Sequence, residues 1–228
     1  MLQSYLRKFY EGCIDLVYPQ VEIPGNVQEL KEPFCNQCGD PLSSELNKRA
    51  CANCRGRTWG LDQARAAYLA EDGVREVIHG FKYEQKSYYY PTLIKWLKEG
   101  FDRFYARDVL EWQPQALVPV PLHFSRLRKR GFNQAEELAK GLSKLTGLPV
   151  WKAIRKVKPT QVQASLRKSQ RLKNQVRVYD LKRGFDVCGA RLLIIDDVFT
   201  TGATVDSCAR VLLKHHADSV CSLTVARG

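Results

Sequence analysis

One stretch, Leu192–Thr204, constrains the fold of this chain more than any other. It reads Leu-Leu-Ile-Ile-Asp-Asp-Val-Phe-Thr-Thr-Gly-Ala-Thr. The four apolar residues Leu192–Ile195 predict a short strand buried on both faces, as in a parallel sheet. Beyond the turn, apolar residues recur at the spacing of a helix that packs on that sheet: Val205, Cys208, Ala209 and Leu212. A strand, a turn and a helix in this order indicate an α/β fold.

The turn has the residue types of an anion site. Asp196 and Asp197 are expected at the carboxyl end of the strand, the edge at which open α/β sheets bind ligands. Free backbone N–H groups, hydroxyls and the positive end of a helix dipole follow at Thr200, Thr201, Gly202, Ala203 and Thr204. Two carboxylates would repel a bare phosphate. They suit a phosphosugar, whose hydroxyls can donate to them and whose metal ion they can neighbour. The alternative is an ordinary buried strand with an Asp/Thr-rich helix cap.

This thirteen-residue pattern resembles the phosphoribosyl-pyrophosphate (PRPP) loop of type I phosphoribosyltransferases. The departure is Phe199, where an aliphatic residue is more usual. The resemblance implies that Asp196 and Asp197 are the catalytic pair and hold the ribose 2′- and 3′-hydroxyls. It implies that Thr200–Thr204 hold the 5′-phosphate, and that Mg²⁺ accompanies the PRPP.

Four cysteines nearer the amino terminus have the spacing of a zinc site. They form the pattern Cys35-x2-Cys38-x12-Cys51-x2-Cys54. Two such knuckles present four thiolates that close a tetrahedron around Zn²⁺, and the metal would supply the folding energy of so polar a segment. No open ligand position is indicated, so we predict a structural site. Two disulfides or free thiols are the alternative, and iron is a weaker competitor.

Length and composition set the domain organisation. The chain has 228 residues, of which 44% are apolar, enough for one mid-sized domain and a small module. We predict an N-terminal segment and zinc finger over 1–62 and a phosphoribosyltransferase-like domain over 63–228. There is no run of about 18 apolar residues and no signal peptide, so we expect a cytoplasmic protein without stable membrane insertion.

Positive charge is concentrated in two stretches of this basic chain, whose net charge is +12. Residues 151–183 carry eleven Lys and Arg against one acid, Asp180, a local balance of +10. The second cluster is Arg126, Arg128, Lys129 and Arg130. Such density suggests a polyanion, either nucleic acid or the pyrophosphate of a substrate. With His123, these arginines fall where cationic donors for a pyrophosphate would be useful.

The remaining chain predicts alternating helices and strands. Strands are expected at Ala64–Leu69, at Ala116–Pro121, whose last residues should leave the sheet, and at Ser219–Val225. Helices are expected over residues 2–17, from an Asp72 N-cap through Phe81, over Pro91–Phe104, and from an Asn133 N-cap with a Glu136 capping box to Gly147. Residues 158–178 predict a mobile loop that closes over the active site, with a disordered nucleic-acid-binding arm as the alternative.

Aromatic residues interleave with lysines from Phe81 to Tyr90. Such a stretch can stack bases while it neutralises phosphates. Equally, its tyrosines can line the contact between the zinc module and the main domain, and we slightly favour this interpretation.

The whole pattern is similar to that of the ComF family, competence-associated proteins that join a four-cysteine zinc module to a phosphoribosyltransferase-like domain. The resemblance is carried by the four cysteines, Phe81-Lys82-Tyr83, Val118-Pro119-Val120-Pro121, Arg130-Gly131-Phe132-Asn133-Gln134, a segment from Thr160 to Asn174, and Asp196-Asp197 with its loop. It implies PRPP binding, with Lys82, Arg126 and Arg130 among the ligands, and the handling of internalised single-stranded DNA, with other competence proteins as further partners.

The resemblance does not fix a reaction. One hypothesis is a PRPP-binding competence protein that contacts single-stranded DNA. The alternative is an active phosphoribosyltransferase of nucleotide metabolism or salvage with no DNA role. In that enzyme Mg²⁺ and basic side chains would stabilise the leaving pyrophosphate, and no protein nucleophile is required.

Overall fold

The computed structural model describes residues 22–23, 25–43, 51–84, 86–106, 112–157 and 178–228. The elements in chain order are β1 (Gln63–Leu69), α2 (Asp72–Tyr83), the 3₁₀ turn η2 (Ser87–Tyr89), α3 (Tyr90–Tyr105), β2 (Ala116–Pro119), α4 (Phe124–Arg130), α5 (Gln134–Thr146), β3 (Ile154–Lys156), β4 (Tyr179–Leu181), β5 (Arg191–Phe199), α6 (Ala203–Lys214) and β6 (Ser219–Arg227).

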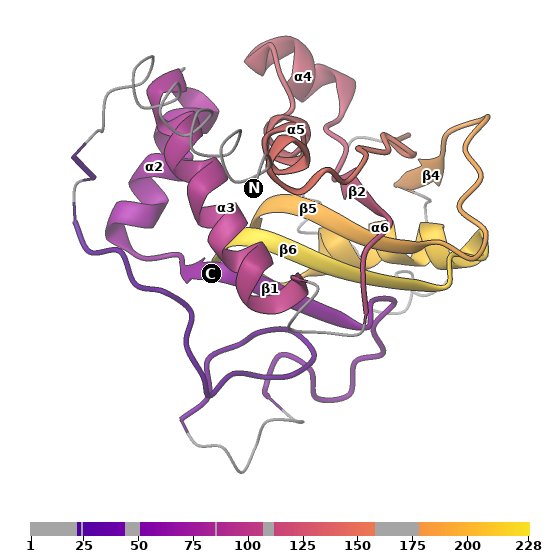
Figure 1. Ribbon diagram of the computed structural model, residues 1–228, viewed down its shortest axis with the longest axis horizontal. Helices are drawn as coiled ribbons and strands as arrows, with labels where there is room; N and C mark the ends of the chain where they lie inside the picture. The colour runs from indigo at the N-terminus through magenta and orange to yellow at the C-terminus, as the bar shows by residue number, and fades with distance from the viewer. Residues whose placement is uncertain (1–21, 24, 44–50, 85, 107–111, 158–177) are drawn as a thin grey trace, which may run out of the picture.

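A parallel sheet of order β1-β6-β5-β2 forms the centre of the molecule, and helices cover both of its faces. Figure 1 shows α3 and α5 in front of the sheet and α6 behind it. Successive residues of β5 point to opposite faces of the sheet. Leu193 and Ile195 join the core under α2, α3 and α5, whereas Leu192 and Ile194 join the core shared with α6 and the cysteines. The predicted α/β class, a parallel sheet flanked by helices, is confirmed.

Within the described residues, each predicted strand and helix corresponds to an observed element, with one difference that affects the site. β5 does not end at Ile195 but runs on to Phe199, because β6 continues beside it and pairs Asp196 with Thr224. On its other side β5 loses its neighbour, since β2 ends at Pro119 opposite Ile195. The acidic pair therefore lies within the strand, at the point where one flank of the sheet stops.

Two predicted helix caps are wrong in detail. Asp72 is the first residue of α2, and Glu71 holds the N-cap position without a side-chain bond. Asn133 is the N-cap residue of α5, but its side chain does not cap the helix. Its Nδ2 donates instead to the carbonyl of Val120, 3.0 Å away, and so ties α5 to the loop after β2. Glu136 pairs with lysines and does not complete a capping box.

Three tyrosines of the Phe81–Tyr90 stretch, Tyr88–Tyr90, do not face the four-cysteine module. Tyr89 is buried in the core of α2, α3 and α5, with Tyr88 and Tyr90 packed against it, whereas the cysteines belong to the core on the opposite face. The Tyr90 hydroxyl donates to the carbonyl of Glu137 in α5. The favoured interpretation of this stretch is wrong, because these rings complete the main-domain core.

The four-cysteine module packs directly against the sheet. Cys35, Cys38 and Cys51 share one buried core with Leu192 and Ile194 of β5 and with the apolar face of α6. The predicted division at residues 62 and 63 stays a prediction. The expected helix over 2–17 lies outside the described residues, as does the expected loop over 158–178 except for its last residue. Among the helices that the structure describes, none is long and apolar enough to span a bilayer.

Candidate functional site

Asp196 and Asp197 lie at the carboxyl half of β5, where the strand has passed the end of β2. Lys82, from the last turn of α2, reaches Asp197 and forms an ion pair with an Nζ–Oδ1 distance of 2.7 Å. The Oδ1 of Asp196 accepts from the backbone N–H of Asp197 at 2.9 Å. The structure thus brings three of the predicted ligand-binding residues together.

The Asp196 carboxyl has a raised pKa. Burial raises its pKa to about 7, and the charge of Asp197 adds to the rise, whereas Lys82 and Lys156 oppose it. Such a carboxyl changes its charge near neutral pH. Ionised, it accepts hydrogen bonds from hydroxyls or neighbours a cation. Protonated, it loses much of that capacity.

The predicted phosphate loop lies at the surface of the protein. Thr200, Thr201 and Thr204 are exposed, whereas Gly202 is buried between them. Gly202 has a φ of +71°, in the left-handed region, and α6 begins at the next residue. Exposed threonines and a helix amino terminus, held on a glycine turn, form a surface that can receive an anion.

Sequence reasoning missed two residues that interact electrostatically with Asp196, namely Lys156 and Tyr179. They are paired across the antiparallel β3–β4 hairpin, with Lys156 Nζ 5.3 Å from the centre of the Tyr179 ring. Burial raises the pKa of Tyr179, whose hydroxyl interacts with the Thr204 side chain. Burial, helped by the charge of Arg126, lowers the pKa of Lys156, and the charge of Asp196 opposes this. The β3–β4 pair therefore contacts the phosphate loop through Tyr179 and interacts with Asp196 through charge.

The predicted cationic donors divide into two groups. Lys82 contacts the acids, and Arg126 acts through its charge on Lys156. Arg130 instead lies over the ring of Tyr83, with Cζ 4.5 Å from the ring centre, and donates to the Gln134 side chain.

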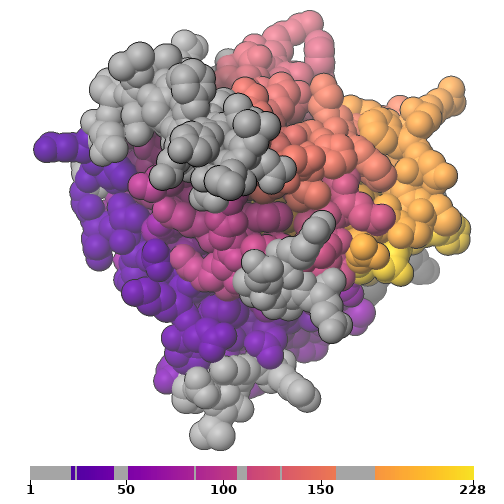
Figure 2. Space-filling model, in the orientation of Figure 1, coloured from indigo at the N-terminus to yellow at the C-terminus, as the bar shows by residue number. Residues whose placement is uncertain are grey.

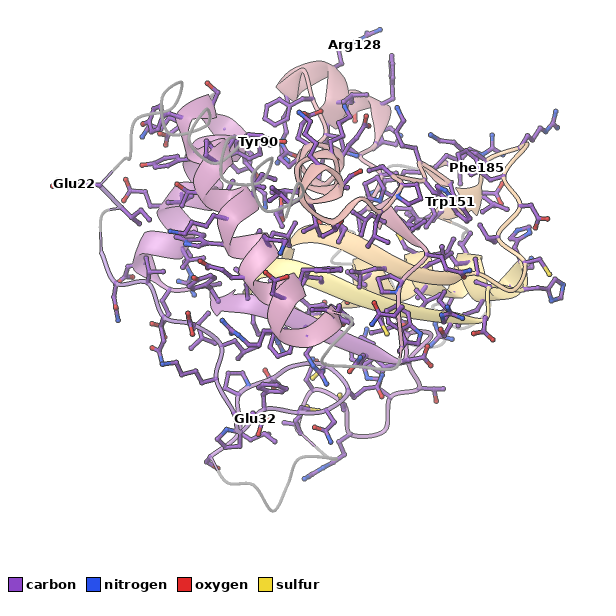
Figure 3. The ribbon with its side chains drawn as sticks, viewed as in Figure 1. Glu22, Glu32, Tyr90, Arg128, Trp151 and Phe185 are labelled. Carbon is purple, nitrogen blue, oxygen red and sulfur yellow. The ribbon has the colours of Figure 1, made fainter. Side chains whose placement is uncertain are left out.

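The other two predicted donors belong to α4 itself. The Nδ1 of His123 caps this helix by accepting from the N–H of Ser125. Arg128 projects from the helix away from the sheet, as Figure 3 shows, and lies over the ring of Phe124.

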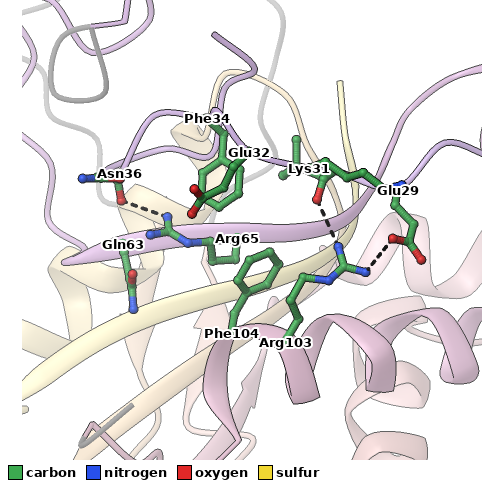
Figure 4. A pocket seen from close by; sticks show the side chains of 10 residues that line it. Glu29, Lys31, Glu32, Phe34, Asn36, Gln63, Arg65, Arg103 and Phe104 are labelled. Atoms are coloured by element: carbon green, nitrogen blue, oxygen red, sulfur yellow. Dashed lines mark hydrogen bonds and ion pairs between the residues drawn. The ribbon is translucent and has the colours of Figure 1, made fainter. Parts of the chain in front are cut away.

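Two cavities lie at the opposite end of the sheet. One of about 430 Å³ is lined by Arg65 of β1 and Arg103 of α3 (Figure 4). Arg103 pairs there with Glu29 at 3.3 Å, and Arg65 donates to the carbonyl of Asn36. The second, of about 750 Å³, shares Arg65 with the first and extends to Trp112. Neither is lined by the acidic pair.

The four cysteines form a compact cluster. Their Sγ atoms all lie within 4.8 Å of one another and could hold a metal ion. The Sγ–Sγ distances are 3.3 Å for Cys38–Cys51 and 3.8 Å for Cys35–Cys54, too long for a covalent bond, and all described cysteines are free. The disulfide alternative is wrong. Burial opposes ionisation of Cys35, but hydrogen bonds from the backbone of Cys38 and Gln37 outweigh it and lower the pKa to about 7.

Comparison with known proteins identifies the family. No protein-family model matches the chain. The competence protein ComFC of Bacillus subtilis is 32% identical over 205 residues, which are 88% of this chain and 80% of that protein. The chain belongs to the ComF family. Competence protein F of Haemophilus influenzae is 28% identical over 186 residues, which are 80% of this chain and 79% of that protein. The DNA utilization protein YhgH of Escherichia coli is 30% identical over 82% of the chain and 81% of its own length.

Solved structures resemble this ComF protein weakly. A hypoxanthine phosphoribosyl transferase of Trypanosoma cruzi is 18% identical with a TM-score of 0.37, over 59% of this chain and 63% of that one. The B. subtilis glutamine PRPP amidotransferase is 17% identical with a TM-score of 0.38, over 59% of this chain and 25% of that one. The structure has the architecture predicted from the sequence, a parallel sheet with flanking helices and an N-terminal four-cysteine cluster.

Proposed function

We propose that this ComF protein is a cytoplasmic PRPP-binding protein of natural competence that handles internalised single-stranded DNA. The observation that carries the PRPP site is the position of Asp196 and Asp197 directly before an exposed threonine loop, with Lys82 paired to one of them. Carboxylates accept from ribose hydroxyls, and the loop with the α6 amino terminus receives the 5′-phosphate. The ComF relatives support the competence role.

Each residue of this site has a distinct task. Asp196 and Asp197 orient the ribose, and Thr200–Thr204 hold the phosphate at one end of it. Lys82 offsets part of the carboxylate charge, 2.7 Å from Asp197, so that a polyanionic ligand is not repelled. Arg126 and Arg130 are proposed ligands of the pyrophosphate. Mg²⁺ bound with PRPP would supply further charge neutralisation beside the acidic pair.

The cysteine cluster fits a structural Zn²⁺ ion. A tetrahedron of four sulfur atoms around zinc has S–S separations of about 3.8 Å, close to the 3.3 and 3.8 Å distances of this cluster. The cysteines fill all four positions and three of them are buried, which leaves no ligand position for chemistry. Zinc is therefore proposed to stabilise the module and not to act on a substrate.

A surface of aromatic rings and arginines beside the site favours DNA over a purely metabolic role. Tyr83 and Phe124 are 59% and 65% exposed, and an arginine lies over each ring, Arg130 and Arg128 respectively. We call these four residues the ring–arginine surface. Figure 2 shows α4, which carries three of them, projecting at the upper edge of the molecule. Exposed rings can stack bases, and arginines can neutralise phosphates. Neither contact depends on the base sequence.

Anisotropy of a labelled single-stranded oligonucleotide tests the DNA role. We expect affinity to fall steeply with salt, and the double variant Tyr83→Ala/Phe124→Ala to bind about tenfold more weakly or worse. Leu213→Ala, which removes an exposed apolar residue of α6, is the control and should bind like the unchanged protein. Absent or salt-insensitive binding would favour the alternative, an active phosphoribosyltransferase of nucleotide salvage.

Titration of PRPP with Mg²⁺, in the presence and absence of that oligonucleotide, separates the two functions. Heat of PRPP binding that does not depend on DNA supports the sugar-phosphate site by itself. Release of pyrophosphate in the same mixtures would show turnover, for which the acidic pair is the proposed catalytic pair.

A further inference from the structure

The segment after the second cysteine knuckle lies against the phosphate loop. The Nη1 of Arg57 donates to the carbonyl of Thr201 at 2.6 Å. The same guanidinium covers Trp59, with Cζ 3.7 Å from the ring centre. Trp59 in turn packs on Phe199, with ring centres 6.0 Å apart. A three-residue segment outside the sheet therefore contacts both the residue before the loop and the loop itself.

The first knuckle reaches the same loop through a buried arginine. Arg227, at the end of β6, is only 6% exposed and pairs with Asp40 at 2.6 Å. Its Nη1 donates to the carbonyls of Phe199 and Thr200, at 3.1 and 2.8 Å. A buried guanidinium without its acid partner carries a large desolvation cost, so Asp40 and Arg227 depend on each other. Asp40 lies two residues beyond Cys38, so this contact also belongs to the cysteine module.

The start of α6 is held from the same side. The N–H of Gly60 donates to the Oδ1 of Asp206 at 2.5 Å, and Asp206 pairs with Arg210 at 3.0 Å. Arg210 donates in turn to the carbonyl of Thr58. These contacts fix the first two turns of α6, whose amino terminus forms one wall of the proposed phosphate site.

Gly202 shows how closely the phosphate loop and the cysteine module pack against each other. A Cβ atom at this position would overlap Phe199 Cζ and come within 2.6 Å of Trp59 Cζ3. The space for the loop is set on one side by the aromatic residue that precedes it and on the other by the cysteine module. This contact also explains why an aromatic residue at Phe199 departs from the usual aliphatic one, since it packs between Trp59 and Arg227.

We propose that the cysteine module is the positioning element of the phosphate loop, with Arg57 and Trp59 as positioning residues. This inference rests on the proposed function. The metal fixes both knuckles, the knuckles fix Asp40, Arg57 and Trp59, and these residues hold the loop in its phosphate-accepting shape. Two ligands that favour the same arrangement bind cooperatively, and the coupling is reciprocal. Metal occupancy therefore strengthens phosphosugar binding, and the phosphosugar slows metal loss.

Amide hydrogen exchange tests the positioning role without any phosphosugar. Arg57→Ala removes the contact to Thr201, and Arg55→Ala is the matched control, an exposed arginine two positions earlier on the same knuckle. In zinc-loaded protein, Arg57→Ala should speed exchange of a peptide over residues 199–206 by on the order of tenfold, with zinc content unchanged. Exchange over β2 should stay the same. Equal exchange over 199–206 in the two variants overturns the proposal.

Zinc release into a chelator tests the coupling. We expect PRPP with Mg²⁺ to slow release several-fold in the unchanged protein and in Arg55→Ala, and to have little effect in Arg57→Ala. A protein that binds PRPP yet releases zinc at the same rate contradicts cooperativity. A protein that binds no PRPP refutes the proposed function, and the exchange experiment then decides the positioning role alone. A chain that retains no metal overturns the proposal as well.

Discussion

Replacing Asp196 by Asn should stabilise this protein, and the gain should grow with pH. The pKa of this carboxyl rises from 3.8 to about 7 on folding, because burial and the charge of Asp197 disfavour its ionised form. Between these two values the folded state holds a proton that the unfolded state has released. The unchanged protein therefore loses stability as the pH rises through this window, up to the folded pKa. An Asn side chain carries no charge and escapes this loss.

The magnitude follows from the width of the window. From pH 5.5 to pH 7 the unfolded group is ionised and the folded group is mostly protonated. Each pH unit then lowers the unfolding free energy of the unchanged protein by about 1.4 kcal/mol, which is about 2 kcal/mol over this interval. Above pH 7 both states are ionised and the difference levels off. We expect the unfolding free energy of Asp196→Asn, relative to that of the unchanged protein, to rise by about 2 kcal/mol from pH 5.5 to pH 8.

Urea unfolding across this pH range, in zinc-containing buffer, measures the difference. Asp218→Asn is the matched control, because Asp218 is exposed on the surface before β6. Its stability should follow that of the unchanged protein at every pH. A difference for Asp196→Asn that stays constant with pH, or a loss of stability at pH 8, would refute the electrostatic account of the acidic pair.

Three further perturbations address the pair, the loop and the metal. Lys82→Ala leaves Asp197 without its ion-pair partner, so PRPP affinity by calorimetry should fall about tenfold, whereas exposed Lys95→Ala should not change it. Gly202→Ala combines a positive φ with a blocked Cβ position and should cost about 2–4 kcal/mol in urea unfolding. Gly184→Ala, at φ +86° with open space around it, should cost only about 1 kcal/mol, and equal costs would contradict the packing account. Removing zinc should lower the melting temperature of the whole chain by about 5 °C or more in calorimetry, since the cysteines share a core with β5; an unchanged value would disprove that dependence.

The sequence contains enough to predict the sheet and the position of the acidic pair within it. Four consecutive apolar residues at Leu192–Ile195 have to be buried on both faces, and a parallel sheet is the arrangement that does this. The helix after Gly202 follows from its apolar spacing. The cysteine cluster follows from its two equal knuckles, whose geometry leaves few alternatives.

Contacts between distant segments could not be predicted in the same way. Lys156 and Tyr179 interact electrostatically with Asp196 only because the antiparallel β3–β4 pair packs on α6. Neither residue has a local pattern that sets it apart from the basic stretch around it. The Asn133 side chain also bonds to a tertiary partner, the Val120 carbonyl, in place of the local cap that its position favours. Side-chain propensity describes the local alternatives, and packing decides among them.

The same limit explains why the burial of Tyr88–Tyr90 could not be predicted. Their spacing with lysines is compatible with a surface or with a core, and their burial depends on α2 and α3 meeting at the turn between them. Tyr83, five residues earlier, stays exposed because it ends α2 and meets Arg130 from α4.

Calorimetric titration of PRPP with Mg²⁺ into the double variant Asp196→Ala/Asp197→Ala tests the central claim most directly. The unchanged protein and the Asp218→Asn control should give a saturable heat of binding. The double variant should give none while it retains its zinc, because the cysteine cluster lies apart from both acids. PRPP affinity that survives the loss of both carboxylates would contradict the site proposed for this ComF protein.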